Sequence, residues 1–95
     1  AKVVASGTVF VDQNLNLTRF SEEAKKIFRL RESDIGRPLS DLNHELDYRD
    51  LINDLTNTLA ISKAVERSIR GQGGRFYLVK MLPYRIPSSS SRGVV

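Results

Sequence analysis

Short runs of branched and aromatic residues open the chain and predict a pair of strands. One run covers residues 8–12, the next covers residues 15–20, and the Gln13-Asn14 pair between them suits a tight hairpin turn. Behind Ser21 the pattern changes, and apolar residues recur three and four positions apart as on one face of a helix that ends near Leu30. The first third of the chain therefore predicts an antiparallel hairpin followed by a short helix.

A stronger helical pattern occupies the middle of the chain. Gly36 and Pro38 interrupt the preceding segment, and residues 40–42 can form one further helical turn. Beyond Asp47, apolar residues recur at the spacing of one face of an amphipathic helix. They are Tyr48, Leu51, Ile52, Leu55 and Leu59. The sequence therefore predicts its longest helix from Asp47 to about residue 61.

Strand-like alternation returns after that helix. Residues 65–70 alternate apolar and polar side chains, the glycine-rich residues 71–74 suit a turn, and residues 74–85 read as the next strand. Pro87 and the serines after it predict a flexible hairpin loop over residues 86–92. The last three residues begin a further strand.

The order of these elements predicts the fold class. Two strands, two or three helices and three more strands indicate an α+β domain with an antiparallel sheet and the helices on one face. With 95 residues, of which 40% are hydrophobic and 27% charged, the chain suits one folded core. We therefore predict a single domain over residues 1–95, with residues 1–6 as an N-terminal lead-in.

The strand at residues 74–85 is apolar on both faces, whereas an antiparallel sheet in a small protein normally has one polar face. Between Phe76 and Tyr84, Lys80 is the one charged residue on either face, and a lone lysine is far less costly beside solvent than in a core. The face that carries Lys80 is therefore predicted to be the outer one. The apolar residues of this predicted interface are Phe10, Phe76, Leu78, Leu82 and Tyr84. Such a patch, on the order of several hundred Å², usually marks a site of association.

Composition removes several classes of chemistry. Cysteine is absent, which excludes disulfides, thiolate metal ligands and chromophores attached through sulfur. No apolar run is long enough to span a membrane, and no targeting segment opens the chain, which begins with Ala1. We therefore expect a cytoplasmic module that belongs to a longer protein.

The charge balance raises the question of a nucleic-acid partner, because 15 basic residues face 11 acidic ones and the net charge is +4. Most of the basic residues are interleaved with acids. Those that the sequence leaves unopposed are Arg67, Arg70, Arg75, Lys80, Arg85 and Arg92. They lie on predicted strands and turns without the aromatic pattern of a single-strand binder, which favours a solvated basic edge and no nucleic acid.

Four stretches of the sequence together resemble a PAS domain. They are TVFVDQNLNLTRFSEEAKKIFRL, SDIGRPLSDL, GRFYLVKMLPYR and RGVV, and they span nearly the whole chain. The combination of DIGRPLSDL with LPYR resembles the PAS modules of bacterial chemotaxis methylesterase/methyltransferase fusions and of sensor kinases.

The resemblance implies a more specific fold than the pattern alone. It implies a five-stranded antiparallel sheet in the order 2-1-5-4-3, with helices over one face around a small cavity, and a role in sensing or signal relay that often involves homodimers. In the family the last strand runs several residues further than Val95. We therefore expect the last strand to be truncated here and the parent chain to continue.

No cofactor and no metal are predicted. PAS domains bind haem, flavin, small acids or nothing, and the resemblance places Leu51 where the haem-binding relatives carry their ligand. The only histidine, His44, precedes the predicted helix and is interpreted as a surface or capping residue. Asp47, Asp50 and Asp54 share a helix stripe, but with no histidine beside them they are interpreted as a solvated face rather than a metal or acid–base site.

An enzyme is not predicted either. One histidine cannot support a Ser-His-Asp arrangement from this sequence, and the glycine cluster lies between strands rather than before a helix.

A small cavity is the one candidate ligand site. Arg67 shares a strand face with apolar residues and is a candidate for holding an acidic ligand. The candidate pocket residues are Val9, Val11, Ile27, Leu39, Leu42, Leu51, Leu55, Leu59, Arg67, Val79 and Met81. Because interiors pack densely and no other convergent polar group is evident, a filled core is favoured over a ligand pocket.

The sequence leaves two functional hypotheses open. The first is a sensory or signal-relay module of a larger bacterial signalling protein that binds a small molecule without a covalent bond and associates through its outer sheet face, as a homodimer or with an effector domain of its own chain. The second is a docking or dimerisation domain without a ligand.

Overall fold

The computed structural model describes residues 7–44, 46–86 and 91–95. The predicted lead-in at residues 1–6 and most of the predicted loop lie outside the described residues. The ends of that loop prediction are wrong, because Ile86, Ser91 and Arg92 belong to strands.

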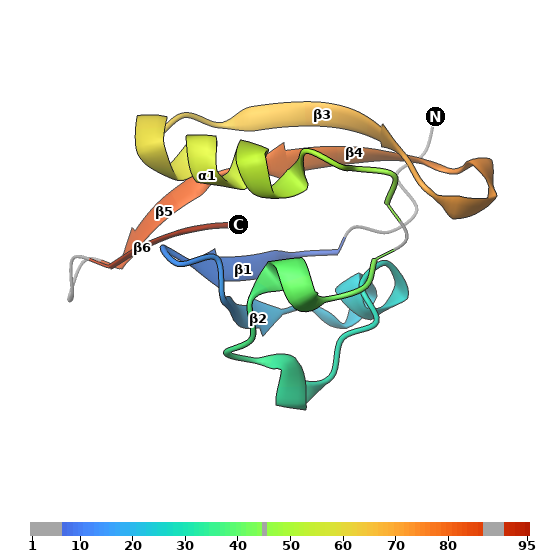
Figure 1. Ribbon diagram of the computed structural model, residues 1–95, viewed down its shortest axis with the longest axis horizontal. Helices are drawn as coiled ribbons and strands as arrows, with labels where there is room; N and C mark the ends of the chain where they lie inside the picture. The colour runs from blue at the N-terminus through green and yellow to red at the C-terminus, as the bar shows by residue number, and fades with distance from the viewer. Residues whose placement is uncertain (1–6, 45, 87–90) are drawn as a thin grey trace.

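Within the described residues, six short strands form two sheets (Figure 1). They are β1 (Val9–Asp12), β2 (Leu17–Phe20), β3 (Val65–Arg70), β4 (Phe76–Met81), β5 (Pro83–Ile86) and β6 (Ser91–Val94). All of the pairings are antiparallel, in a four-stranded sheet of order β2-β1-β6-β5 and a two-stranded sheet of β3 and β4. The predicted α+β class with an antiparallel sheet is confirmed.

The single strand predicted at residues 74–85 is divided into β4 and β5 at Leu82. Leu82 and Val95 exchange backbone hydrogen bonds of 2.8 and 2.9 Å, so the ladder of β5 with β6 continues across this break. Since β4 and β5 are successive halves of one predicted strand, the arrangement corresponds to the order 2-1-5-4-3 with its fourth strand divided.

Pro83 fits the ladder because of its position. Pro83 lies opposite Val94. The neighbouring pairs of the ladder are Leu82 with Val95 on one side and Tyr84 with Gly93 on the other. In an antiparallel ladder bonded and non-bonded pairs alternate, so the nitrogen of Pro83 faces away from β6 and no ladder hydrogen bond is lost.

The helical segments are shorter than the pattern predicts. They are η1 (Glu22–Lys26), η2 (Glu32–Asp34), η3 (Leu39–Asp41), α1 (Leu51–Ile61) and η4 (Gln72–Gly74), of which α1 alone is an α-helix. The helix predicted from Ser21 to Leu30 is reduced to η1. The Ser21 hydroxyl accepts the Thr8 backbone N–H at 2.9 Å, so this side chain ties the segment to β1 instead of capping a helix.

The long helix begins at Leu51, four residues later than predicted. Tyr48 lies in the segment before α1 and its side chain is buried. The helix ends where Ser62 adopts a left-handed conformation, with φ 54° and ψ 38°. Among the described residues, no helix has the length and apolar character needed to cross a membrane.

The core lies between α1 and the sheet. In Figure 1, α1 runs along the part of the sheet that contains β3 and β4, and the chain from η1 to η3 gathers beside β1 and β2. The main buried cluster consists of Val11, Leu39, Tyr48, Leu51, Leu55, Met81 and Val94. A smaller cluster of Leu17, Ala24 and Leu30 lies under η1. One face of the sheet is therefore covered, and the other is open.

Candidate functional site

The open face of the sheet carries large apolar side chains. Phe76 is 71% exposed, Leu78 63% and Leu82 44%, whereas Met81 is 2% exposed. This alternation confirms the prediction that Phe76, Leu78 and Leu82 point outward and that Met81 faces the core. We call Phe10, Phe76, Leu78, Leu82 and Tyr84 the outer-face strip.

The two remaining members of the outer-face strip pack on each other. The rings of Phe10 on β1 and Tyr84 on β5 meet edge to face, with centroids 5.7 Å apart, although β6 runs between their strands. The Tyr84 hydroxyl reaches across β6 and donates to the backbone carbonyl of Val11 at 3.2 Å. Gly93 makes this crossing possible, since a Cβ at that position would lie 2.6 Å from the Tyr84 ring. Phe10 and Tyr84 are consequently half-buried.

Charged groups flank the outer-face strip. The guanidinium of Arg19 lies 5.2 Å from the Phe10 ring centroid, and that of Arg70 lies 5.3 Å from the Phe76 ring centroid. Lys80 is directly opposite Glu66 in the register of β3 and β4. Because opposite charges face each other across these strands, Lys80 is not the unopposed cation that the sequence indicated.

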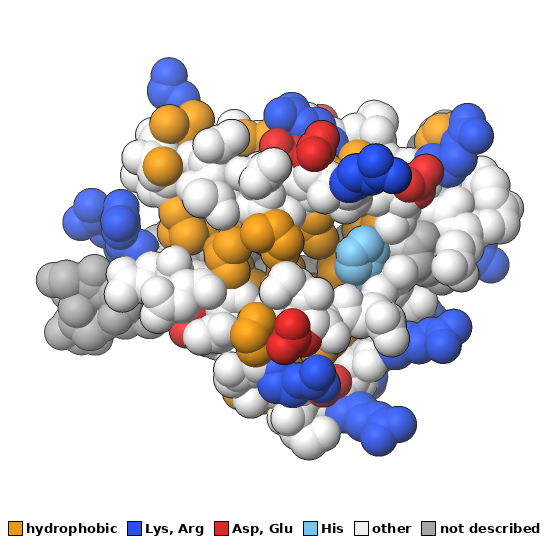
Figure 2. All heavy atoms as spheres, in the orientation of Figure 1, with side chains coloured by type: hydrophobic (Ala, Val, Ile, Leu, Met, Phe, Trp, Pro, Cys, Tyr) orange, Lys and Arg blue, Asp and Glu red, His pale blue; other side chains and the backbone are white. Residues whose placement is uncertain are grey.

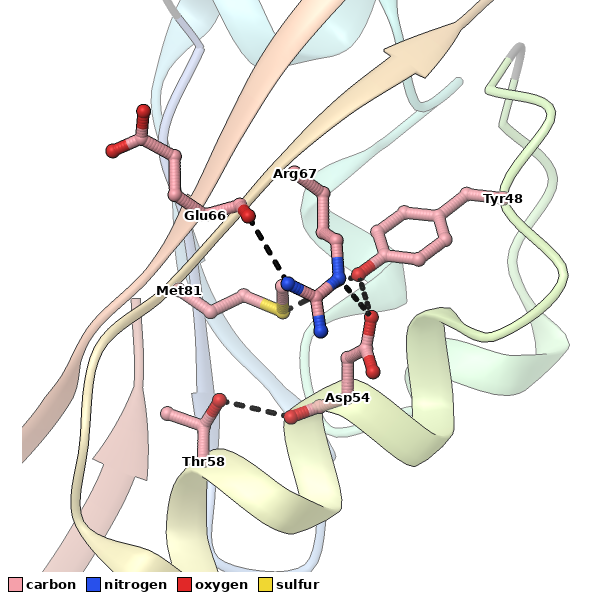
Figure 3. Close-up of polar contacts among 6 residues, drawn as sticks. All are labelled: Tyr48, Asp54, Thr58, Glu66, Arg67 and Met81. Carbon is pink, nitrogen blue, oxygen red and sulfur yellow. Dashed lines mark hydrogen bonds and ion pairs between the residues drawn. The ribbon is translucent and has the colours of Figure 1, made fainter.

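On the covered side of the sheet, a polar cluster joins α1 to β3 (Figure 3). Arg67 Nε lies 3.3 Å from Asp54 Oδ2, and the Tyr48 hydroxyl donates to the same carboxylate oxygen. The Tyr48 hydroxyl also lies 3.9 Å from the sulfur of Met81, and Thr58 donates to the backbone carbonyl of Asp54 at 2.8 Å. One carboxylate therefore connects the helix, the strand and the segment before the helix.

The environment of Tyr48 opposes its ionisation. Burial of the ring raises the pKa of Tyr48, and the hydrogen bond to the Asp54 carboxylate and its negative charge raise this pKa further. Arg67 lowers it by a smaller amount. The fold thus favours the neutral phenol, which donates to Asp54.

This cluster corrects two predictions. Asp54 does not belong to a solvated helix face, because its side chain is 15% exposed and bonds to Tyr48 and Arg67. Arg67 is not unopposed, since its guanidinium is held by Asp54 and by the Glu66 carbonyl at 3.2 Å. Asp47 and Asp50 are exposed as expected.

The candidate pocket residues are distributed through the core. Val11, Leu39, Leu51, Leu55 and Met81 belong to the main buried cluster, and Val9, Leu42, Leu59 and Val79 are partly buried against it. Ile27 is half-buried just after η1, and Arg67 lies at the edge beside Asp54. The structure therefore brings nine of the eleven residues into one packed cluster.

Two surface clefts border that cluster. One, of about 380 Å³, is lined by His44, Leu46, Asp47, Arg70, Gly71 and Gln72. The other, of about 170 Å³, is lined by Leu59, Ser62, Pro83, Tyr84, Arg85, Arg92 and Gly93. Of the candidate pocket residues only Leu59 contributes to either cleft.

Figure 2 shows the helical side of the molecule. Hydrophobic side chains form a band across its middle, and the histidine lies at one end of this band. The His44 ring is half-buried against Phe28, with centroids 5.3 Å apart, and its Nδ1 accepts the Leu46 backbone N–H at 3.2 Å. His44 thus stabilises a local turn.

The described part of the chain contains no group of three or more His, Asp or Glu side chains that could hold a metal ion. The residues that sequence reasoning missed are the partners Tyr48 and Asp54. Tyr48 was assigned to the helix, and Asp54 and Arg67 lie on different elements, so no local spacing connects them. The one signal in the sequence was the position of Asp54 beside the apolar stripe of the predicted helix, where its carboxylate could reach a partner in the core.

Known proteins share the sequence pattern and the fold of this chain. Residues 1–95 match a family model described as PAS domain. The chain is 51% identical over 94 residues to a protein of Rhodobacter capsulatus described as an uncharacterized 104.1 kDa protein in the hypE 3′ region, and the match covers 99% of this chain but 10% of that protein. The chain therefore spans about a tenth of the length of this relative.

Solved structures with the same fold include the PAS domain of histidine kinase ThkA. It superposes with a TM-score of 0.70 at 16% identity, over 90% of this chain and 93% of that one. A selenomethionine variant of that domain superposes with a TM-score of 0.68, also at 16% identity, over 92% of this chain and 94% of that one. At this identity the likeness concerns the fold.

Proposed function

This chain belongs to the PAS domain family, and from that premise we propose that it is a sensory or signal-relay module of a larger bacterial signalling protein. The proposal includes a cytoplasmic location, and a parent protein of the chemotaxis methylesterase/methyltransferase or sensor-kinase type. It also includes association of two copies through the outer-face strip.

The observation that carries the proposal is the exposure of the outer-face strip. Phe76, Leu78 and Leu82 are 71%, 63% and 44% exposed on one face of two successive strands. Neighbouring exposed apolar side chains of this size usually mark an interaction surface, because their hydration is unfavourable. A surface of this kind supports association rather than catalysis.

A second copy of this chain is the occupant that we propose. Both signs of charge lie beside the strip, with Lys80 on β4 and with Glu66 and Arg70 on β3. In a two-fold dimer the same patch faces itself in the opposite direction, so cations of one copy can meet the acid of the other.

The polar cluster supplies a route for relay. Asp54 on α1 is bonded to Arg67 on β3, and β3 pairs with β4, whose outer side carries Phe76 and Leu78. A ligand or partner that repacks the surroundings of α1 would act on the sheet through this connection, and through the sheet on an effector.

Sedimentation of the wild type and of Leu78→Asp tests the association. We expect the wild type to form a dimer at sufficient concentration and Leu78→Asp to be a monomer, because a buried unpaired carboxylate at the interface is strongly unfavourable. Ile35→Asp is the matched control, since Ile35 is 44% exposed in the loop after η2 and lies off the strip.

The control should retain the dimer. A wild type that stays monomeric at every concentration would refute association of two copies, and a dimer that persists in Leu78→Asp would place the interface elsewhere.

Ligand binding in the core is a separate part of the proposal. The residues that we propose around a small ligand are Val9, Val11, Ile27, Leu39, Leu42, Leu51, Leu55, Leu59, Arg67, Val79 and Met81. Native mass spectrometry of the purified protein tests this part, since a bound molecule adds its own mass to the protein.

The second candidate function is docking or dimerisation without a ligand. The packed core favours it, because Val11 and Met81 are each 2% exposed and Arg67, the one charged candidate, already holds Asp54. Repeated spectra of the bare chain mass would support this candidate over ligand sensing.

A further inference from the structure

Two arginines face each other directly on the last hairpin. Arg85 on β5 and Arg92 on β6 are partners in the register, one step beyond the pair of Tyr84 with Gly93. Hydrogen-bonded and non-bonded residue pairs alternate along an antiparallel ladder. Counted from the hydrogen-bonded pair of Leu82 with Val95, the pair of Arg85 with Arg92 is non-bonded, and in such pairs the opposite side chains lie closest. Like charges directly opposite on adjacent strands repel each other and destabilise the pairing.

Neither arginine has an acidic partner within residues 7–44, 46–86 and 91–95. The ion pairs found there are Lys25 with Glu22, Arg37 with Asp34, and Arg67 with Asp54. Arg85 and Arg92 are both exposed. Figure 2 shows basic side chains at the end of the molecule where β5 and β6 meet. The positive charge at this end is therefore not compensated within the described chain.

Arg85 and Arg92 line the smaller cleft, between the C-terminal end of α1 and the last hairpin. Leu59 and Ser62 contribute from the helix end, and Pro83 contributes from β5. The cleft has a volume of about 170 Å³, which leaves room for a small oxyanion.

The carbonyl groups at the end of α1 carry partial negative charge and oppose an anion nearby. They amount to about half of one charge, against two whole positive charges on Arg85 and Arg92. No hydrogen bond from either guanidinium to these carbonyls is found in the described structure. The balance of charge at the cleft therefore favours an oxyanion.

We propose that Arg85 and Arg92 form a binding site for a small oxyanion, a phosphate or carboxylate group, in this cleft. Planar guanidinium groups bind both groups through paired N–H···O bonds, and the bound anion removes the repulsion between the two arginines. The site adjoins the end of α1, and of the outer-face strip only Tyr84 borders it, so the anion test does not depend on association through Phe76, Leu78 and Leu82.

Thermal unfolding and titration calorimetry of the intact chain test the site, with inorganic phosphate in one arm and acetate in the other. Sodium chloride at equal ionic strength is the reference, because it screens charge without a specific oxyanion contact. We expect phosphate or acetate to raise the melting temperature by several degrees beyond chloride. The arm that binds more tightly identifies the oxyanion group.

Arg85→Gln and Arg92→Gln should each weaken binding by about tenfold or more, because each removes one charged donor. Both variants should fold without anion at least as well as the wild type, since each removes one of two facing charges. Arg75→Gln is the matched control. Arg75 is an exposed arginine just after η4, at the turn between β3 and β4, and this variant should bind the anion like the wild type.

Three results would overturn the site. They are a wild type that responds to phosphate and acetate no more than to chloride, a double variant Arg85→Gln/Arg92→Gln that keeps the response, and an equal loss of binding in Arg75→Gln.

Discussion

Gly93 lies where β6 passes beneath the ring of Tyr84, and a side chain at this position has no space. A Cβ there would be 2.2 Å from the Val11 carbonyl oxygen and 2.6 Å from the Tyr84 ring. We expect Gly93→Ala to lower the free energy of unfolding by about 3 kcal/mol, because the ring and β1 must both move. Denaturant unfolding measures this.

Ser68→Ala is the control for Gly93→Ala, since Ser68 is exposed on β3 and should change stability by less than about 0.5 kcal/mol. A Gly93→Ala protein as stable as the wild type would contradict the crossing of Tyr84 over β6.

Asp34 is a buried carboxylate whose ionised form is stabilised by the fold. Its two oxygens accept the Arg31 backbone N–H and an Arg37 N–H, each at 2.9 Å. The backbone hydrogen bond from Arg31 lowers the pKa of Asp34 most, burial opposes this, and Arg37 lowers the pKa further.

Because this pKa is lowered on folding, ionised Asp34 stabilises the protein above the usual carboxyl pKa of 3.8. The stabilisation is lost as the pH falls from there through the native pKa. We expect Asp34→Asn to be less stable than the wild type at pH 7 and this difference to shrink in acid, as measured by unfolding at a series of pH values. Asp41→Asn, at an exposed aspartate, is the control and should leave the free energy of unfolding at pH 7 within about 0.5 kcal/mol of the wild type.

At the scale of elements, α1 is fixed to the sheet by the polar cluster as well as by its apolar face. Tyr48 is 7% exposed, and its hydroxyl donates to the Asp54 carboxylate. Tyr84 is half-buried, and its hydroxyl donates to the neutral backbone carbonyl of Val11. Hydrogen bonds to charged groups contribute more, so we expect Tyr48→Phe to cost about 2 kcal/mol of unfolding free energy and Tyr84→Phe about 1 kcal/mol.

The pH dependence of Tyr48→Phe gives a second measurement. Because the pKa of Tyr48 is raised on folding, its contribution is complete below the usual tyrosine pKa of 10.0 and is lost as the pH rises beyond that value. The wild type should therefore lose its advantage over Tyr48→Phe in alkali. An ultraviolet titration in which Tyr48 ionises at its usual pKa in the folded protein would contradict the cluster.

The elements also show what a sequence pattern can and cannot predict. Alternation over residues 74–85 predicted which side chains face outward, because the faces of a strand follow from its period alone. The start of α1 was predicted too early, since Tyr48 fits the apolar spacing of a helix while it packs from the non-helical segment before α1. The Asp54–Arg67 pair was not predicted because it depends on how α1 lies across β3.

For the whole molecule, the sheet is unevenly supported. β6 lies between β1 and β5, and its Val94 is 1% exposed beneath α1, whereas β3 and β4 pair with each other and leave their outer side chains exposed. The β3–β4 hairpin continues the larger sheet through Leu82 and Val95. Each of β1 and β6 is therefore flanked by a strand on both sides, whereas β3 and β4 pair with each other and expose their outer side chains.

Local opening follows such differences, because a segment with few buried contacts opens without global unfolding. We expect backbone amides of β1 and β6 to exchange with deuterium at least about tenfold more slowly than those of β3 and β4 near η4, where Phe76 and Arg70 lie. Amides near Met81 should be intermediate, since Met81 is buried in the core. Exchange followed by nuclear magnetic resonance at low protein concentration checks this order in the monomer. Uniform protection across these strands would mean that the hairpin opens only with the whole domain, so that a signal could not loosen it separately.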